Sequence, residues 1–203
     1  MKSINIIGSG GHCRAVIPLL SKEKYALSIF DDSFDAGKEE FILGVKLKGK
    51  VSAIPKDDTE IVLAIGDNNL RALMFNQFKD RLFKEKIIAN TAYVGEEVKI
   101  GNSTIVFHHV LVNSCATIGA NTIVNSKALI EHECRIGDHC HISIASLIGG
   151  RVKIGDHCFI GAGAIIKDQI EITDHVTIGA GGVVINSITE PGTYVGNPLR
   201  KIK

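Results

Sequence analysis

The sequence predicts a small α/β domain followed by a parallel β-helix built from hexapeptide repeats. In residues 1–88, short apolar strands alternate with helical patterns and glycine turns. From Val94 to Val184, an Ile or Val recurs every six residues at sixteen consecutive positions without a gap. Such repeats are typical of solenoids, in which each repeat forms one flat face and neighbours stack to bury a continuous core. We therefore place the domains at residues 1–88 and 89–203.

The first part reads as a small Rossmann-like parallel sheet. Its elements are expected in this order: strand 4–7, glycine turn 8–12, helix 13–20, strand 27–30 ending at Asp31 and Asp32, strand 61–65, loop 66–69 and helix 70–86. Ligands of open parallel sheets bind at the carboxyl edge, where these glycine and aspartate loops lie. The GSGGH loop alone is a weak dinucleotide motif, because Cys13 stands where that pattern has Gly. The strand, glycine turn and helix start nevertheless suit a phosphate.

The repeats of the second part predict a triangular prism. Asp-His pairs recur at 138–139, 156–157 and 174–175, at intervals of 18 residues or three hexads. Equivalent corners therefore return once per coil. The open ends and flat sides of such a prism favour association.

Composition and charge exclude several classes of function. The chain has 203 residues, of which 23 are Lys or Arg and 22 are Asp or Glu, giving a net charge of +1. Such a balance offers no overall field to bind nucleic acid or an anionic membrane. The N-terminus lacks the apolar segment of a signal peptide, and no apolar run approaches the ~18 residues of a membrane span, so we expect a cytoplasmic protein without membrane insertion. The cysteines are interpreted as reduced thiols, because Cys134, Cys140 and Cys158 occupy small core positions of the repeat.

One hexad, Ile130 to Arg135, departs from the repeat. Two carboxylates flank His132 where glycine and neutral turn residues are usual. Such departures often mark functional sites, although a solvated corner is the alternative interpretation. Histidine has a reference pKa of ~6.5 and can accept a proton near neutral pH, and an adjacent carboxylate can fix its tautomer.

Several motifs together resemble one enzyme family. They are the GSGGH loop, Asp31-Asp32, IGDNNLR, the EHE triplet, the hexads and the ending PGTYVGNPLRK. The whole chain resembles the left-handed β-helix nucleotide-sugar N-acetyltransferases of bacillosamine and perosamine type, whose plan the sialic acid O-acetyltransferases share. The resemblance implies a left-handed helix, a homotrimer with active sites between subunits, acetyl-CoA in the groove between two β-helices, and a nucleotide sugar held by the N-terminal domain.

The resemblance also assigns roles to residues. It makes His132 the general base, Glu133 (or, second, Glu131) its orienting carboxylate, and Asn125 a polar residue near the acceptor. His141 would contact the cofactor near its thioester, and backbone N–H groups near Gly149 and Gly150 could hold the oxyanion. The remaining residues expected at the cofactor are Ala162, Lys167, Ala180, Gly196, Asn197, Pro198 and Arg200. Those expected at the nucleotide sugar are Gly10, Gly11, His12, Asp31, Asp32, Gly66, Asp67, Asn68 and Arg71. Asp67 stands where Asn is more usual in related sequences.

No metal is expected. His139, His157 and His175 invite comparison with γ-class carbonic anhydrases, which bind zinc with three histidines on a similar β-helix. A ladder at one-coil spacing would stack the rings roughly 4.8 Å apart, whereas tetrahedral zinc needs convergent ligands.

The sequence therefore predicts an acetyl-CoA-dependent N-acetyltransferase acting on the amino group of a nucleotide-linked 4-amino-4,6-dideoxy sugar, for surface glycan synthesis. Three alternatives remain. One is O-acetylation of sialic acid or another sugar hydroxyl, which the same histidine could serve. The second is a non-catalytic β-helix partner of a biosynthetic enzyme. The third is a zinc hydrolyase, which a metal analysis would expose.

Overall fold

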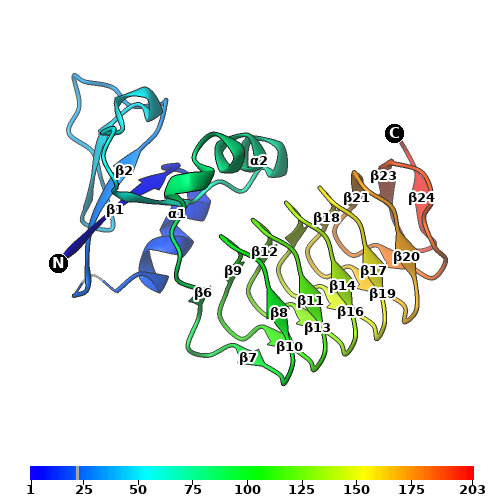
Figure 1. Ribbon diagram of the computed structural model, residues 1–203. Coiled ribbons are helices and arrows are strands. Elements are labelled where there is room, and N and C mark those ends of the chain that lie inside the picture. Colours follow the sequence, from blue (N-terminus) through cyan, green and yellow to red (C-terminus); the bar gives the residue numbers. More distant parts are fainter. Residues whose placement is uncertain (22) are drawn as a thin grey trace. The chain divides into compact units, whose positions relative to one another are not determined.

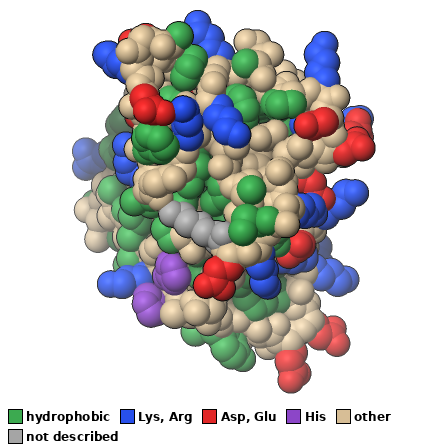
Figure 2. Space-filling view, turned by 90° about the vertical axis from the view of Figure 1, so that its left-hand side faces the viewer, with side chains coloured by type: hydrophobic (Ala, Val, Ile, Leu, Met, Phe, Trp, Pro, Cys, Tyr) green, Lys and Arg blue, Asp and Glu red, His purple; other side chains and the backbone are tan. Residues whose placement is uncertain are grey.

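The computed structural model describes residues 1–21 and 23–203, which form two compact units (Figure 1). The first spans Met1–Glu85 and the second Lys86–Lys203. Figure 2 shows basic and acidic side chains interspersed on the face that it displays, in keeping with a net charge of +1.

The first unit is built on a five-stranded sheet of order β3-β4-β2-β1-β5. Its strands are β1 (Lys2–Ile7), β2 (Tyr25–Phe30), β3 (Phe41–Ile42), β4 (Val45–Gly49) and β5 (Glu60–Leu63). Strand β1 pairs in parallel with β2 and β5, and β4 in parallel with β2. The antiparallel β3-β4 hairpin was not predicted. Lysines alternate with apolar residues along β4, as in a half-buried strand, but its partner β3 is only two residues long and carries no such pattern.

The helices of the first unit are shorter than predicted. They are α1 (Gly11–Val16) and α2 (Asn68–Gln77), with 3-10 turns at Ile17–Leu19, Val51–Ala53 and Lys79–Arg81. The predicted helix 70–86 was too long at its end. Leu82 leaves the helical path to form a parallel bridge with Ile61, and Arg81 Nη2 donates to Thr59 O at 3.0 Å. Pairing with the sheet edge thus replaces the last helical turns.

The second unit is a parallel β-helix with three faces, as the 18-residue period predicted. Face 1 consists of β7 (Tyr93–Val94), β10 (Leu111–Val112), β13 (Leu129–Ile130), β16 (Leu147–Ile148), β19 (Ile165–Ile166) and β22 (Val183–Val184). Face 2 consists of β8 (Lys99–Ile100), β11 (Thr117–Ile118), β14 (Arg135–Ile136), β17 (Lys153–Ile154) and β20 (Glu171–Ile172). Face 3 consists of β6 (Ile87–Ile88), β9 (Ile105–Val106), β12 (Ile123–Val124), β15 (His141–Ile142), β18 (Phe159–Ile160), β21 (Val176–Ile178), β23 (Gly192–Val195) and β24 (Arg200–Lys201).

Each corner of the prism is made by a residue in the left-handed backbone region. From Glu97 to Gly181, the fourth residue of every hexad, counted from the inward Ile or Val, has a φ between 53° and 66°. The inward first and fifth residues of the hexads form one core. Corner 1–2 follows face 1, corner 2–3 follows face 2 and corner 3–1 follows face 3, so each functional side chain can be placed by its hexad position.

The end of the chain folds back onto the last coil. Strand β24 pairs antiparallel with β23, and Val183 N–H donates to Gly196 O at 3.2 Å. The predicted residues Gly196, Asn197 and Pro198 therefore form a turn beside the last strand of face 1. Among the described residues, no helix is long and apolar enough to cross a membrane.

The cysteines are free thiols, and four of the five are buried. Cys134, Cys140 and Cys158 fill fifth positions of the repeat in the core, as predicted. Burial raises the pKa of Cys134, and separately that of Cys13, to about 11, so neither is a thiolate near neutral pH. Cys115 differs, because it lies exposed at a corner.

Candidate active site

His132 and Glu133 lie together at corner 1–2, between β13 and β14. The left-handed backbone at Glu133, with φ 60°, turns the chain, while the following Cys134 is buried. Glu133 Oε2 lies 3.0 Å from His132 Nδ1, and both side chains remain about half exposed. The hexad that departs from the repeat therefore carries a histidine–carboxylate pair on the surface of the prism.

The second carboxylate of this hexad, that of Glu131, binds other groups. Glu131 Oε2 accepts hydrogen bonds from Asn113 Nδ2 at 2.9 Å and from the backbone N–H of His132 at 3.2 Å. Of the two orienting groups considered from the sequence, Glu133 is thus the one in contact with the imidazole ring.

This contact determines what the ring can do chemically. A carboxylate accepts from Nδ1–H, so the neutral ring keeps its lone pair on Nε2, the atom that can take a proton. Nε2 lies over Gly150 of the next coil, where an added Cβ would approach it to 2.9 Å. Gly150 thus leaves space for the ring in its present position.

The backbone beside the ring offers one donor for an oxyanion. The Gly149 N–H is bound to Ile166 O at 2.9 Å in the ladder between coils. At corner 2–3, the N–H at the third hexad position of Ala120, Asp138 and Asp156 is capped by the aspartate of the next coil, at 2.6–2.8 Å. No described residue caps the equivalent N–H of Gly150, although Asp168 occupies the matching position above it.

Arg151 belongs to the same constellation and was missed by sequence reasoning. Its Nε donates to Glu133 Oε2 at 2.9 Å, the oxygen that also faces His132. The contact with His132, followed by that with Arg151, lowers the pKa of the Glu133 carboxyl. The signal was present in the sequence, because residues 133 and 151 are one coil apart and occupy the same hexad position.

Asn125 and His141 form a second polar pair, at corner 3–1 and on face 3. Asn125 Oδ1 accepts from Ser126 N–H at 2.8 Å, which fixes the orientation of the amide. Asn125 Nδ2 therefore faces His141 Nε2, 3.1 Å away, and His141 also packs edge-on against Phe159. An amide donor at Nε2 favours the neutral ring with its proton on Nδ1.

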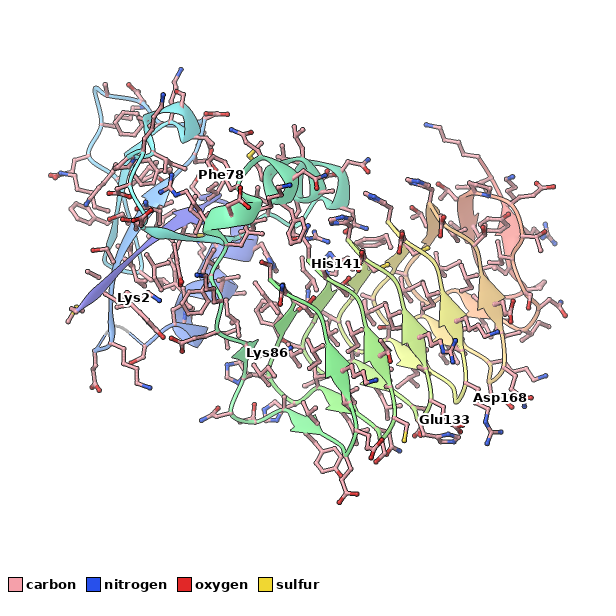
Figure 3. The ribbon with its side chains drawn as sticks, in the orientation of Figure 1. Lys2, Phe78, Lys86, Glu133, His141 and Asp168 are labelled. Atoms are coloured by element: carbon pink, nitrogen blue, oxygen red, sulfur yellow. The ribbon has the colours of Figure 1, made fainter. Side chains whose placement is uncertain are left out.

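A single β-helix does not bring the two pairs together. Asn125 and His132 lie in one coil but at opposite borders of face 1, and Figure 3 shows Glu133 and His141 at different edges of the β-helix. A site that uses both pairs needs a second copy of the chain.

In the later coils, corner 3–1 carries only the smallest side chains. The second to fourth hexad positions there are Gly161, Ala162, Gly163, Gly179, Ala180 and Gly181. The predicted cofactor residues Ala162 and Ala180 are exposed in this row. Lys167 and Arg200 are exposed and without an ion pair among the described residues, whereas Lys201 Nζ binds Glu190 Oε2 at 2.9 Å.

In the first unit, the predicted loops gather at the carboxyl edge of the sheet. Asp31 Oδ2 accepts from Ser9 N–H at 2.7 Å and Asp31 Oδ1 from Ser33 N–H at 2.9 Å. Burial opposes ionisation of Asp31, but these hydrogen bonds outweigh it and lower its pKa. Asp32 Oδ1 accepts from Val51 N–H at 3.1 Å. Both carboxylates therefore organise loops.

Two glycines of this edge have no packing reason to be glycine. A Cβ on Gly10 or on Gly11 would meet no atom within 4 Å, and neither residue has a positive φ. Gly8 differs, because its φ is +108° and a Cβ would lie 2.6 Å from Ala64 O. The space above Gly10 and Gly11 is open at the start of α1.

The loop after β5 is held by its own side chains. Asp67 caps α2 by accepting from Leu70 N–H at 2.8 Å. Arg71 is only 1% exposed, and its guanidinium donates to Ile65 O, Gly66 O and Asn68 Oδ1 at 2.8–3.2 Å. Gly66 lies beside His12, since its Cβ would be 3.9 Å from His12 Cβ. Asp67 and Arg71 thus shape the loop from within.

The histidine ladder at corner 2–3 stacks as predicted. Ring centroids of His139, His157 and His175 are 4.8 Å apart from one coil to the next. Across residues 1–21 and 23–203, no group of three or more His, Cys, Asp or Glu side chains is arranged to hold a metal ion.

Comparisons with known proteins show to which family the chain belongs. The PglD N-terminal domain family matches residues 3–78, and the bacterial transferase hexapeptide family (six repeats) matches residues 151–186. The chain is similar to PerB from Caulobacter crescentus, whose crystal structure contains CoA and GDP-perosamine. The two sequences are 30% identical, and the structures align with a TM-score of 0.89. The alignment covers 100% of this chain and 98% of the PerB chain. The chain belongs to the hexapeptide-repeat sugar N-acetyltransferases.

Two further solved structures match the chain over its whole length. The acetyltransferase domain of PglB from Neisseria gonorrhoeae is 26% identical with a TM-score of 0.90, and WeeI from Acinetobacter baumannii is 25% identical with a TM-score of 0.88; in both, 100% of each chain is covered. Among curated protein sequences, none matches the chain.

Proposed function

We propose that this N-acetyltransferase moves the acetyl group of acetyl-CoA to the amino group of a nucleotide-linked 4-amino-4,6-dideoxy sugar for surface glycan synthesis, with His132 as general base. The observation that carries the proposal is the His132–Glu133 pair, whose 3.0 Å contact leaves Nε2 as the basic atom. Support for the substrates comes from the related PerB structure, which contains CoA and GDP-perosamine.

The proposed transfer can be followed through the bonds that form and break and through the proton that moves. The sugar amine attacks the thioester carbonyl and gives its proton to His132 Nε2 while the C–N bond forms. Glu133 stabilises the imidazolium, and the Gly150 N–H donates to the oxyanion of the tetrahedral intermediate in this proposal. The C–S bond then breaks, and the imidazolium can protonate the departing CoA thiolate. No protein nucleophile takes part, and none of the cysteines is required.

A homotrimer packed through face 1 would complete the site. The outward residues of this face form an unbroken apolar column of Tyr93, Leu111, Leu129, Leu147, Ile165 and Val183. The corresponding column of face 2 is Lys99, Thr117, Arg135, Lys153 and Glu171. A contiguous exposed apolar stripe is typical of a protein interface. Because corners 3–1 and 1–2 border face 1, packing of this face sets Asn125 and His141 of one copy against His132 of the next.

The two substrates have separate places in this proposal. The row of Gly and Ala side chains at corner 3–1 lets the extended arm of CoA approach the backbone, with Lys167 and Arg200 as cations near its phosphates. The open space above Gly10 and Gly11 accepts the diphosphate of the sugar nucleotide, whose negative charge suits exposed N–H groups at a helix start. By the family resemblance, His12, Asp31, Asp32, Gly66 and Asn68 are proposed to lie near the bound nucleotide sugar.

A panel assay tests the proposal. The purified protein is incubated with acetyl-CoA and UDP-, GDP- or dTDP-linked 4-amino-4,6-dideoxy sugars, with their 4-hydroxy analogues as matched controls. Free thiol release and product mass are recorded. Acetylation of an amine and not of its hydroxyl analogue supports the proposal. Transfer to hydroxyls alone would make the protein an O-acetyltransferase and overturn it.

A further inference from the structure

A single carboxylate oxygen at corner 1–2 serves two cationic partners. Glu133 Oε2 is 3.0 Å from His132 Nδ1 and 2.9 Å from Arg151 Nε. The arginine comes from the next coil and, at 58% exposure of its side chain, reaches along the surface to this one oxygen. Nothing in the repeat requires an arginine there, since the fourth hexad position carries Cys115 one coil below Glu133 and Gln169 one coil above Arg151.

We propose that Arg151 is a positioning residue that, through the Glu133 carboxylate, keeps His132 in its free-base form at lower pH than the histidine–glutamate pair alone would allow. The inference rests on the proposed role of His132 as general base. Arg151 does not touch the reacting atoms in this account.

The physical basis is competition for one negative charge. A lone carboxylate beside an imidazole favours the protonated ring and so raises its pKa. An arginine, which stays charged at all relevant pH, offsets part of that charge when it binds the same oxygen. Arg151 also limits the rotamers of Glu133, which keeps the carboxylate facing Nδ1. A base with a lower proton affinity is available over a wider pH range, although it is intrinsically weaker.

The carboxylates around the ring act in the opposite direction to Arg151, whereas Lys167 acts in the same direction. Within its own turn, His132 has Glu131 and Glu133, of which Glu131 is bound by Asn113. The coils below present Glu96, Glu97 and the Cys115 thiol at the same corner, and the coils above present Arg151, Lys167 and Asp168. Most of these groups are carboxylates, and Arg151 is the cation bound to the carboxylate that faces the ring.

The test compares Arg151→Met, which removes the charge but keeps an apolar stem, with Arg151→Lys, which keeps the charge. The pH profile of kcat/KM and an NMR titration of the His132 ring are measured in the full-length protein. Arg151→Met should move the acidic limb and the ring titration up by about 0.5 pH unit, the size expected for one charge several ångströms away near a surface. Activity below the limb should then fall about threefold, while Arg151→Lys should retain most of the wild-type profile.

A second comparison shows whether the effect passes through Glu133. In a Glu133→Gln background, the same Arg151→Met change should shift the His132 titration by less than half as much. An equal shift in both backgrounds, or an acidic limb that does not move in Arg151→Met, would overturn the inference. The NMR titration separates it from the proposed function: if His132→Ala keeps full turnover, the proposed base is wrong, yet the ring titration still answers whether Arg151 acts on it.

Discussion

At the scale of single residues, the chain separates glycines that the fold needs from glycines that it does not. Gly8 is needed, because its φ of +108° and its contact with Ala64 O exclude a side chain. Gly11 is the first residue of α1 and has open space above it. Since alanine is a better helix former than glycine, a glycine here has no intrinsic advantage for folding. The proposed approach of the nucleotide diphosphate to the backbone would account for this glycine.

This contrast gives a matched pair of substitutions. Gly11→Ala should leave the melting temperature unchanged or slightly raised, while KM for the nucleotide sugar rises about tenfold or more because the methyl group occupies the diphosphate space. KM for acetyl-CoA should not change. Gly8→Ala should instead lower the free energy of unfolding by more than ~1 kcal/mol. Thermal melts and KM values for both substrates check this, and an unchanged sugar KM in Gly11→Ala would argue against the proposed diphosphate position.

The residue scale also shows where reasoning from sequence stops. The EHE hexad could be singled out because it departs from its neighbours, but the choice between Glu131 and Glu133 could not be made. That choice depends on Asn113, one coil below, which binds Glu131 and leaves Glu133 to the ring. Arg151 was overlooked for a related reason: its partner is 18 residues away, and an exposed arginine in a repeat resembles any solvated corner residue.

At the scale of elements, the β-helix could be predicted because its sequence repeats with a regular period. The first unit has no such period, so its elements were harder to predict. Each Ile or Val of the repeat marks one strand and one face, so the corners of all coils follow from counting. In the first unit, the β3-β4 hairpin carries no clear apolar alternation on both strands, and α2 ends where Leu82 finds a partner in Ile61. These features depend on tertiary pairing rather than on local pattern.

The apolar column of face 1 and the polar column of face 2 allow a prediction about assembly. Leu147→Asp places a charge in the apolar column of face 1, where Leu147 is 41% exposed, so the proposed trimer should dissociate while the coil itself stays folded. Thr117→Asp, on the outward side of face 2, is the matched control and should remain trimeric. Light scattering coupled to size exclusion gives the masses, and circular dichroism reports the fold. A Leu147→Asp protein that stays trimeric and active would place the interface elsewhere.

At the scale of the whole molecule, the proposed reaction is divided between copies of one chain. Each β-helix carries the proposed base, His132, at corner 1–2, and the Asn125–His141 pair together with the row of small residues lies across face 1 at corner 3–1. In the proposed trimer, one protomer therefore holds both halves of a site, and a second copy is needed to join them. In each copy, the proposed binding site for the nucleotide is the carboxyl edge of the first unit's sheet, beside Gly10 and Gly11.

The most direct test of the central claim is the turnover of His132→Ala on the amino sugar identified by the panel, measured at saturating acetyl-CoA. If His132 is the base, kcat should fall roughly 10²-fold or more with little change in acetyl-CoA affinity, because a positioned base acts in the transition state. The oligomeric mass is measured on the same sample and should match the wild-type protein. Wild-type turnover in this variant would show that His132 is not the base, because the proton of the amine would then go to another group.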